Sequence, residues 1–264
     1  MGPSAKPHLT LDKYCGLLKD YLAPALPALN PQSPSFDEAL THNFLDTLAG
    51  TALAATGKKI YGEKFTPYRG TASRALAALE RYHPKIKFVN LTRDGRDVIA
   101  SGAAHWLNLR LCRASGGERE ELEEALHNRA ILAEDFEMFL DYWKDAAQAG
   151  LAARERFPHY LHVRYEDFLE EPVTQAEQLF KFLGLKVDSA TVRACVDATS
   201  FDQLSGGRPR GEEDPASFFR KGIAGDWRNW FTAEQQARFE ETAGVLLERL
   251  GYTREAAAMC EAAA

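Results

Sequence analysis

Two adjacent cations followed by a glycine carry the strongest chemical signal in the sequence. Arg220 and Lys221 precede Gly222, within the segment Ser-Phe-Phe-Arg-Lys-Gly-Ile-Ala-Gly-Asp-Trp at 217–227. An arginine offers a planar fork of donors and a lysine offers a compact charge, while a glycine lets the backbone approach a ligand closely. The cluster therefore predicts a site for a terminal phosphate, although a solvated basic loop has the same composition.

A second basic site lies upstream, where a predicted strand ends. Arg93 follows the strand at 86–91, and Ser101 lies eight residues later, in the next predicted helix. A strand, turn and helix can return that hydroxyl to the guanidinium, so that both groups contact one phosphate. Asp94 and Asp97 are suited to cap or charge-complement the helix start. An ordinary helix start with surface charges would show the same pattern.

The apolar pattern predicts strands that alternate with helices. The predicted strands are 58–62, 86–91 and 160–165, and the predicted helices are 10–23, 36–55, 71–82, 96–112, 118–148, 172–183, 189–197 and 232–250. This order is typical of an α/β fold, with a parallel sheet flanked by helices and ligands beyond the carboxyl ends of the strands. The glycine-rich and charged residues 205–214 are predicted to form a mobile loop.

Composition narrows the class of protein. The chain has 264 residues, 45% of them hydrophobic, and a formal net charge of −6, which suits one large globular domain and disfavours general nucleic-acid binding. The four cysteines are widely spaced, with no CxxC pair, which favours a reducing, cytoplasmic location and predicts no metal site. No apolar stretch approaches ~18 residues, so no membrane span is predicted.

The ordered set of segments resembles the sulfotransferase family, whose sulfuryl donor is 3′-phosphoadenosine 5′-phosphosulfate. The similarity extends from about residue 58 to 252 and rests on Arg93-Asp94-x-x-Asp97-x-x-x-Ser101, Tyr165-Glu166-Asp167, Thr199-Ser200-Phe201, Arg220-Lys221-Gly222 and Gly225-Asp226-Trp227. The resemblance implies a parallel sheet like that of the P-loop NTPases. It also implies nucleotide contacts. The 3′-phosphate would be held by Arg93, Ser101, Arg220, Lys221 and Gly222, the adenine by Tyr165, and the rest of the adenosine by Thr199 and Phe201.

The segment Glu63-Lys64-Phe65-Thr66-Pro67 resembles the part of the family that supplies an active-site lysine. In sulfuryl transfer the acceptor hydroxyl loses a proton while negative charge grows on the departing bridging oxygen. An ammonium group at that point stabilises charge that the ground state lacks. The resemblance gives this role to Lys64, and the plainer alternative is a lysine exposed to water.

The general base stays open. Cytosolic family members have a histidine at the position of Thr66, so the histidine mechanism is absent here. Glu63 is a candidate because it adjoins the lysine, and Glu38 and His42 are candidates on an early predicted helix. His105 follows Ser101 by about one helical turn and is also a candidate. A carboxylate would need burial to raise its pKa toward neutrality.

The first strand and phosphate loop of the family are not found in the sequence. Residues 1–10 hold a few of the expected residue types, but no predicted strand precedes them and two prolines interrupt them. The expectation is a single sulfotransferase-like domain over 1–264, with a helical region at 1–57 and a nucleotide-binding core at 58–252.

Three functions are compared on this basis. The first is transfer of a sulfuryl group to a hydroxyl or amine acceptor, which could belong to a small molecule, a glycan or a peptide. The alternative is a catalytically impaired nucleotide-binding pseudoenzyme or a truncated fragment, because the phosphate loop is not found. A nucleotide kinase is disfavoured because the sequence has no GxxxxGK[ST] segment.

Overall fold

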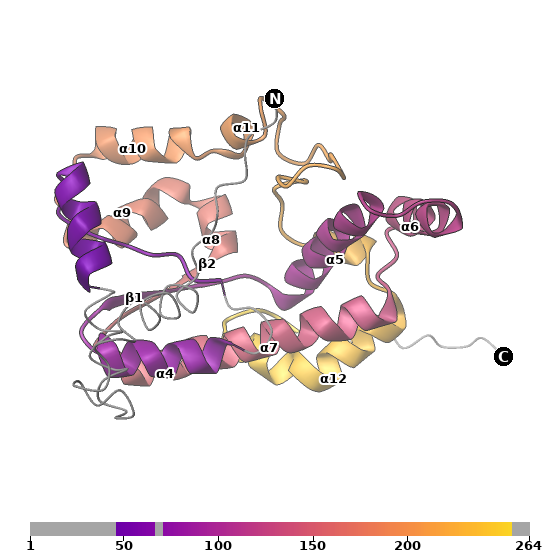
Figure 1. Cartoon of the computed structure of the whole chain (residues 1–264), viewed down its shortest axis with the longest axis horizontal. Helices are drawn as coiled ribbons and strands as arrows, with labels where there is room; N and C mark the ends of the chain where they lie inside the picture. The colour runs from indigo at the N-terminus through magenta and orange to yellow at the C-terminus, as the bar shows by residue number, and fades with distance from the viewer. Residues whose placement is uncertain (1–45, 67–70, 255–264) are drawn as a thin grey trace, which may run out of the picture. The chain divides into compact units, whose positions relative to one another are not determined.

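The structure is a computed structural model that describes residues 46–66 and 71–254 (Figure 1). The chain divides into two compact units between Thr66 and Pro67. The predicted helix at 10–23, Glu38 and His42 lie outside the described residues. The prediction of a single domain with a boundary after residue 57 stays a prediction.

The described part of the first unit is a helix followed by irregular chain. Residues 46–56 are helical, in agreement with the described end of the helix predicted at 36–55. The strand predicted at 58–62 is wrong, because residues 58–66 adopt no strand conformation. A strand forms only when a neighbouring strand accepts its hydrogen bonds, and a short apolar stretch does not by itself supply that partner.

The second unit alternates helices with two strands. Its elements are α4 (Ala72–Tyr82), β1 (Lys87–Thr92), α5 (Gly95–Leu111), α6 (Gly117–His127), α7 (Ala133–Arg156), β2 (His159–Arg164), α8 (Tyr165–Glu170), α9 (Pro172–Leu183), α10 (Ser189–Ala198), α11 (Phe201–Leu204), the 3-10 helix Asp226–Asn229 and α12 (Ala233–Arg249). Seven predicted elements are thereby confirmed within one or two residues at each end: the strands at 86–91 and 160–165, and the helices at 71–82, 96–112, 172–183, 189–197 and 232–250.

The helix predicted at 118–148 is wrong as a single element. α6 ends at His127, with Asn128 as its C-cap, and α7 begins only at Ala133. Arg129 has a φ of 53°, in the left-handed region that interrupts a right-handed helix. The apolar periodicity on both sides of this turn hid the break.

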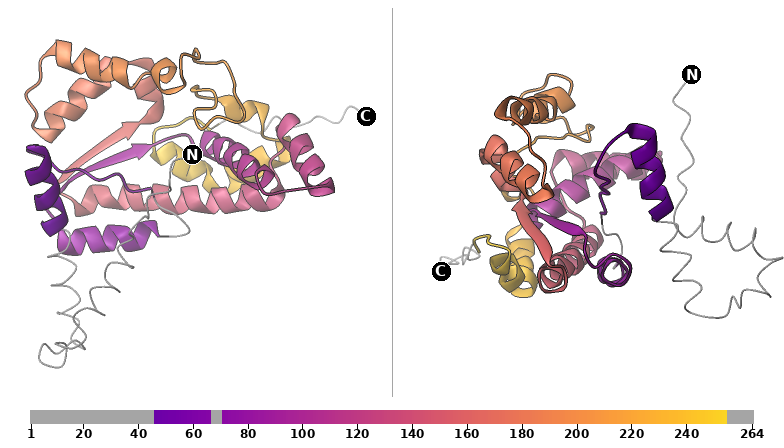
Figure 2. Two further views of the ribbon diagram at one scale, coloured as in Figure 1. Left: turned by 45° about the horizontal axis from the view of Figure 1, so that its top comes forward. Right: turned by 90° about the vertical axis from the view of Figure 1, so that its left-hand side faces the viewer.

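β1 and β2 form a parallel sheet, with Lys87 opposite His159 and Thr92 opposite Arg164. Helices α4 and α7 lie on one side of the strands, and α8, α9 and α10 lie on the other (Figure 2). The predicted α/β fold, with a parallel sheet flanked by helices, is therefore confirmed in this unit. Because parallel strands end at one edge, the residues that follow β1 and β2 come close together.

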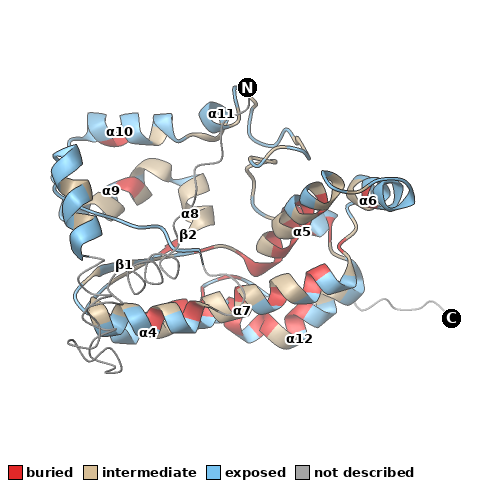
Figure 3. Ribbon diagram, viewed as in Figure 1, coloured by how far each residue is buried: buried red, intermediate tan, exposed pale blue. Residues whose placement is uncertain are grey.

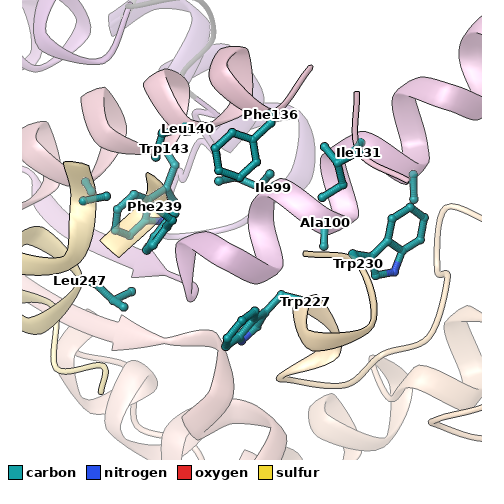
Figure 4. Close-up of a cluster of buried hydrophobic side chains, with 14 of the residues drawn as sticks. Ile99, Ala100, Ile131, Phe136, Leu140, Trp143, Trp227, Trp230, Phe239 and Leu247 are labelled. Carbon is teal, nitrogen blue, oxygen red and sulfur yellow. The ribbon is translucent and has the colours of Figure 1, made fainter. Parts of the chain in front are cut away.

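The main core lies where α5, α7 and α12 meet the 3-10 helix (Figure 3). Ile99, Leu107, Phe239 and Leu247 are almost fully buried there, and each contributes about 1.5–3 kcal/mol by burial. Figure 4 shows several of the side chains that build this core, including Trp227 from the 3-10 helix. The core therefore holds the 3-10 helix and the start of α5 in one packed body.

The start of α5 is fixed by its own sequence. The Asp94 carboxylate caps the helix by accepting a hydrogen bond from the backbone N–H of Arg96, at 2.9 Å. Gly95 lies against the Trp143 indole, where a Cβ atom would come within 2.6 Å of the ring. A larger residue at this position would push α5 away from α7 and displace the residues that follow β1.

No helix among residues 46–66 and 71–254 combines the length and apolar content needed to cross a bilayer. The same described residues contain no group of three or more histidine, cysteine, aspartate or glutamate side chains placed to hold a metal ion.

Candidate functional site

Arg93 lies at the end of β1 and connects three segments. Its Nη2 donates to the carbonyl oxygen of Ile223, at 3.5 Å, and its Cζ lies 4.8 Å from the centre of the Tyr165 ring. The Nε atom is buried and has no hydrogen-bond partner in the described part of the chain. An unpaired buried donor costs about 1–3 kcal/mol, which a bound anion would offset.

A buried carboxylate joins the two basic segments. Asp97, in the first turn of α5, accepts hydrogen bonds from the backbone N–H groups of Gly225 at 2.6 Å and Trp227 at 3.0 Å. Burial raises the pKa of Asp97, while the two hydrogen bonds act in the opposite direction. Segments about 130 residues apart in sequence therefore meet at the start of α5.

Asp226 holds both cations of the downstream segment. Its carboxylate accepts hydrogen bonds from Arg220 at 2.6 Å, Lys221 at 2.7 Å and Asn229 at 2.9 Å. Burial tends to raise the pKa of Asp226, but hydrogen bonds from Lys221, Asn229 and Arg220 outweigh it and hold the pKa well below its usual range. The Trp230 ring lies 5.2 Å from the Arg220 Cζ and supports the guanidinium from one face.

A second carboxylate reaches Arg220 from the preceding loop. Glu213 pairs with Arg220 Nη1 through one oxygen and with Arg129 Nη2 through the other, at 3.0 Å. Burial raises the pKa of Glu213, but hydrogen bonds from Arg129 and Arg220 exceed this effect and lower it overall. Glu213 thus links the Arg220 segment to the turn between α6 and α7.

The loop around Glu213 is held by backbone contacts. The Arg208 guanidinium donates to the carbonyl oxygens of Glu212, Phe219 and Arg220. The backbone N–H groups of Gly211 and Asp214 donate to Lys221 and Arg220, each at 2.9 Å. The mobility predicted for 205–214 stays a prediction. The composition of this loop did not indicate the contacts that hold it.

Phe201 and Gly222 lie directly against each other. Gly222 has a φ of 70°, and a Cβ atom built there would overlap the Phe201 ring. The Arg208 Cζ also lies 5.3 Å from the centre of that ring. Thr199 is exposed at the end of α10, where its hydroxyl donates to the Cys195 carbonyl at 2.9 Å. Phe201 and Gly222 therefore share one surface.

Ser101 and Tyr165 complete the predicted binding set. Ser101 is half-buried on α5, and its hydroxyl makes no hydrogen bond with any residue that the structure describes. Tyr165 begins α8 directly after β2 and lies under the Arg93 guanidinium. The structure brings together Arg93 with Tyr165, and Arg220 with Lys221 and Gly222. Nucleotide binding by these residues stays a prediction.

Lys64 and Glu63 belong to the first unit, and both are exposed. Glu63 accepts a hydrogen bond from the Tyr61 hydroxyl, which raises the pKa of Tyr61 to about 12. Its exposure does not provide the burial that a carboxylate base requires. His105 is exposed too, and the centre of its ring lies 5.9 Å from that of Phe218.

Sequence reasoning missed the carboxylates that hold the cations. Asp226 lies only five residues after Lys221, so its pairing has a local signal that composition alone did not reveal. Glu213 and Arg129 are 84 residues apart, and no sequence pattern connects them. A hollow of about 520 Å³ between α9 and α10, lined in part by Phe180, contains none of the predicted site residues. We place the candidate site at Arg93, Arg220 and Lys221, because a phosphate requires hydrogen-bond donors.

Comparison with known proteins establishes the family. Residues 75–251, more than half of the chain, match the family model for the sulfotransferase domain. The chain belongs to the sulfotransferase family. The matched residues include all eight predicted nucleotide-binding positions of this sulfotransferase chain, and they begin after Lys64.

The curated relatives are also sulfotransferases. Human sulfotransferase 1C2 is 27% identical over 164 residues, which cover 59% of this chain and 52% of the relative. Flavonol 3-sulfotransferase of Flaveria bidentis is 28% identical over 184 residues, which cover 63% and 55%. The chain therefore spans about half the length of the curated relatives it matches. A solved structure of mouse sulfotransferase SULT7A1 complexed with PAP aligns over 62% of this chain and 61% of that chain, at 21% identity and a TM-score of 0.44.

Proposed function

We propose that this sulfotransferase binds 3′-phosphoadenosine 5′-phosphosulfate and transfers its sulfuryl group to a hydroxyl or amine acceptor. The main observation in support of this proposal is the link that Asp97 makes between the Arg93 segment and the Arg220–Lys221 segment. Both segments lie within the residues that match the family. A dianionic phosphate ester suits a site in which several cations approach one another.

Two groups of the second unit that lack a partner among the described residues fit the 3′-phosphate end of this nucleotide. Arg93 has a buried Nε atom without a partner in the described residues, and Ser101 carries a hydroxyl likewise without one. We assign the 3′-phosphate to these two residues together with Arg220, Lys221 and Gly222. Each offers a donor or, at the glycine, an accessible backbone.

The aromatic residues fit the adenosine. The Tyr165 ring, at the start of α8, lies 4.8 Å from the Arg93 Cζ, and Phe201 lies against Gly222. A planar base stacks on such rings with about 1–3 kcal/mol per contact. We propose that Tyr165 contacts the adenine and that Phe201, with Thr199, lines the rest of the adenosine pocket.

We propose that Lys64 is the catalytic cation and Glu63 the candidate general base. The bound donor supplies the sulfuryl group. The Lys64 ammonium stabilises negative charge that grows on the bridging oxygen, and Glu63 accepts the acceptor proton. The Glu63 carboxylate would have to be shielded from solvent for this role. The hydrogen bond that it accepts from Tyr61 is one contact that orients it.

Donor turnover with a panel of phenols, alcohols and amines tests this proposal. Lys64→Ala is expected to reduce the turnover number by about 100-fold or more while the affinity for the donor changes little. Lys59→Ala removes another exposed lysine from the same unit and serves as the matched control. Equal turnover by both variants would remove Lys64 from the mechanism.

The alternative function is nucleotide binding without transfer. All eight proposed nucleotide contacts lie in the second unit, whereas Lys64 lies in the first, so binding and chemistry depend on different parts of the chain. Titration with 3′,5′-adenosine bisphosphate separates the two functions. Tight binding without turnover of any acceptor would favour the binding module.

We further propose a cytoplasmic location and a small-molecule acceptor. Cys112 and Cys195 are free and exposed, a state that a reducing compartment preserves. The relatives include a protein named for a flavonol, which is a small phenol. Fractionation of cells and the acceptor panel test these two points.

A further inference from the structure

Arg220 is already engaged on both terminal nitrogens. Nη1 pairs with Glu213, and Nη2 donates to Asp226 at 2.6 Å, while Nε is buried without a partner in the described residues. The side chain is only 10% exposed. The two carboxylates neutralise the charge of this guanidinium, so a ligand phosphate gains the full attraction of that charge only if one of them gives way.

The two carboxylates differ in how firmly they are held. Asp226 is 2% exposed and also binds Lys221 and Asn229. Glu213 is 15% exposed, and its second partner is Arg129, whose side chain is 44% exposed. Glu213 also lies on a loop, whereas Asp226 begins a 3-10 helix that packs in the core. Glu213 is therefore the carboxylate that a ligand can displace.

We infer that Glu213 sets the affinity and specificity for the phosphate ester by competing with it for Arg220. This inference rests on the proposed nucleotide binding. Two effects act in the same direction. The phosphate must replace a charge-assisted hydrogen bond, and a dianion close to Glu213 meets a like charge. Asp226 instead positions Arg220 and Lys221 beneath the ligand.

Arg129 gives Glu213 a second partner during this exchange. When Glu213 leaves Arg220, its other oxygen can stay with Arg129, at 3.0 Å in the structure. The displaced carboxylate thus does not become an isolated charge, and the cost of displacement stays moderate. A nucleotide without the 3′-phosphate has no group that displaces Glu213 from Arg220. The competition therefore does not change the affinity for that nucleotide.

The test is Glu213→Gln in the full chain, studied by calorimetric titration with 3′,5′-adenosine bisphosphate and with adenosine 5′-monophosphate. The bisphosphate is expected to bind about tenfold more tightly than to the wild type, because the competing charge is gone, and the monophosphate to bind equally well. Glu212→Gln is the matched control, since it removes the same charge from an exposed neighbouring position. It is expected to change neither affinity.

A double-variant cycle with Arg220→Ala isolates the competition. Without Arg220, Glu213→Gln is expected to leave the affinity for the bisphosphate unchanged. A tenfold gain that persists in that background would show a general charge effect and overturn the inference. Weaker binding by Glu213→Gln alone would show that Glu213 positions Arg220, which also overturns it.

The failure of the proposed function has a different signature. A wild-type chain that binds the bisphosphate and the monophosphate equally would overturn the nucleotide site and, with it, this inference. A wild type that discriminates, combined with an unchanged Glu213→Gln, would overturn the inference alone. Thermal unfolding confirms that each variant is folded. Should Glu213→Gln not fold, Glu213→Asp repeats the test, because the shorter side chain withdraws the carboxylate from Arg220.

Discussion

At the scale of single residues, Arg93 offers the cleanest test of ligand contact. Arg93→Ala is expected to weaken binding of 3′,5′-adenosine bisphosphate by about 1–3 kcal/mol, the usual value of a charged hydrogen bond. Adenosine 5′-monophosphate should lose little, because it lacks the group that Arg93 contacts. Calorimetry with both ligands measures the difference, and Arg113→Ala at an exposed position is the control. Equal losses for both ligands would mean that Arg93 is structural.

Gly222 permits a prediction about close approach. Gly222→Ala places a side chain at a φ of 70°, which is unfavourable for alanine, and its Cβ atom would clash with the Phe201 ring. Gly206→Ala has a similar φ of 78° but no atom within 4 Å, so it isolates the backbone cost of about 1 kcal/mol. Urea unfolding should show a larger loss for Gly222→Ala, and calorimetry should show weaker nucleotide binding for that variant only. Similar behaviour of the two variants would argue against a shared surface of Gly222 and Phe201.

Asp226 gives a prediction about pH. Its hydrogen bonds hold the folded pKa below the unfolded value near 3.9, so its stabilising contribution is complete above about pH 5 and is lost as the pH falls toward the folded pKa. Asp226→Asn is expected to lower the free energy of unfolding by about 3 kcal/mol at pH 7, because Lys221 loses its carboxylate partner and Arg220 loses one of two. The deficit should shrink below about pH 4 in urea unfolding curves. Asp197→Asn, at an exposed position, should show no such trend.

The cations of the site were predictable because their signal is local. Arg220, Lys221 and Gly222 are consecutive, and Arg93 follows a clear strand. The anions that hold them were not predictable in the same way. Glu213 reaches Arg220 through a loop whose path depends on Arg208, and such a path follows from tertiary packing rather than from neighbouring residues.

At the scale of elements, Arg208 is the residue that orders the loop at 205–218. Arg208→Ala removes its three donations to backbone carbonyls, so the amides of Gly211 and Asp214 should exchange hydrogen faster. Hydrogen exchange followed by mass spectrometry measures this change. Arg210→Ala is the control, because Arg210 donates to Leu169 outside the loop. Unchanged exchange in Arg208→Ala would contradict this role.

The elements themselves show what periodicity can and cannot predict. α9 and α12 were predictable because apolar residues recur at helical spacing and because Gly184 and Thr232 mark an end and a start. The break after α6 was not, since Arg129 is a residue type that rarely adopts a left-handed conformation. The short apolar stretch at 58–62 shows that a strand also depends on a partner that no local pattern describes.

At the scale of the whole molecule, the second unit contains the main core and a smaller one around Leu76, Ala153 and Phe157, which are the two buried clusters formed by the described residues. A fragment covering 67–264 is therefore expected to fold by itself and to bind 3′,5′-adenosine bisphosphate with an affinity close to that of the full chain. It should not turn over the donor, because it lacks Lys64. Circular dichroism, calorimetry and an activity assay measure these three properties. An unfolded fragment would show that the two units depend on each other for stability.

The connection made by Asp97 depends on the side chain of one partner and on the backbone of the other. The carboxylate supplies both acceptors, while its partners are main-chain groups that nearly every amino acid possesses. A substitution in the downstream segment can therefore leave these two hydrogen bonds to α5 intact, provided that Gly225 keeps its backbone conformation. A substitution of Asp97 itself would remove both acceptors at once, so this one side chain determines whether the downstream segment stays attached to α5.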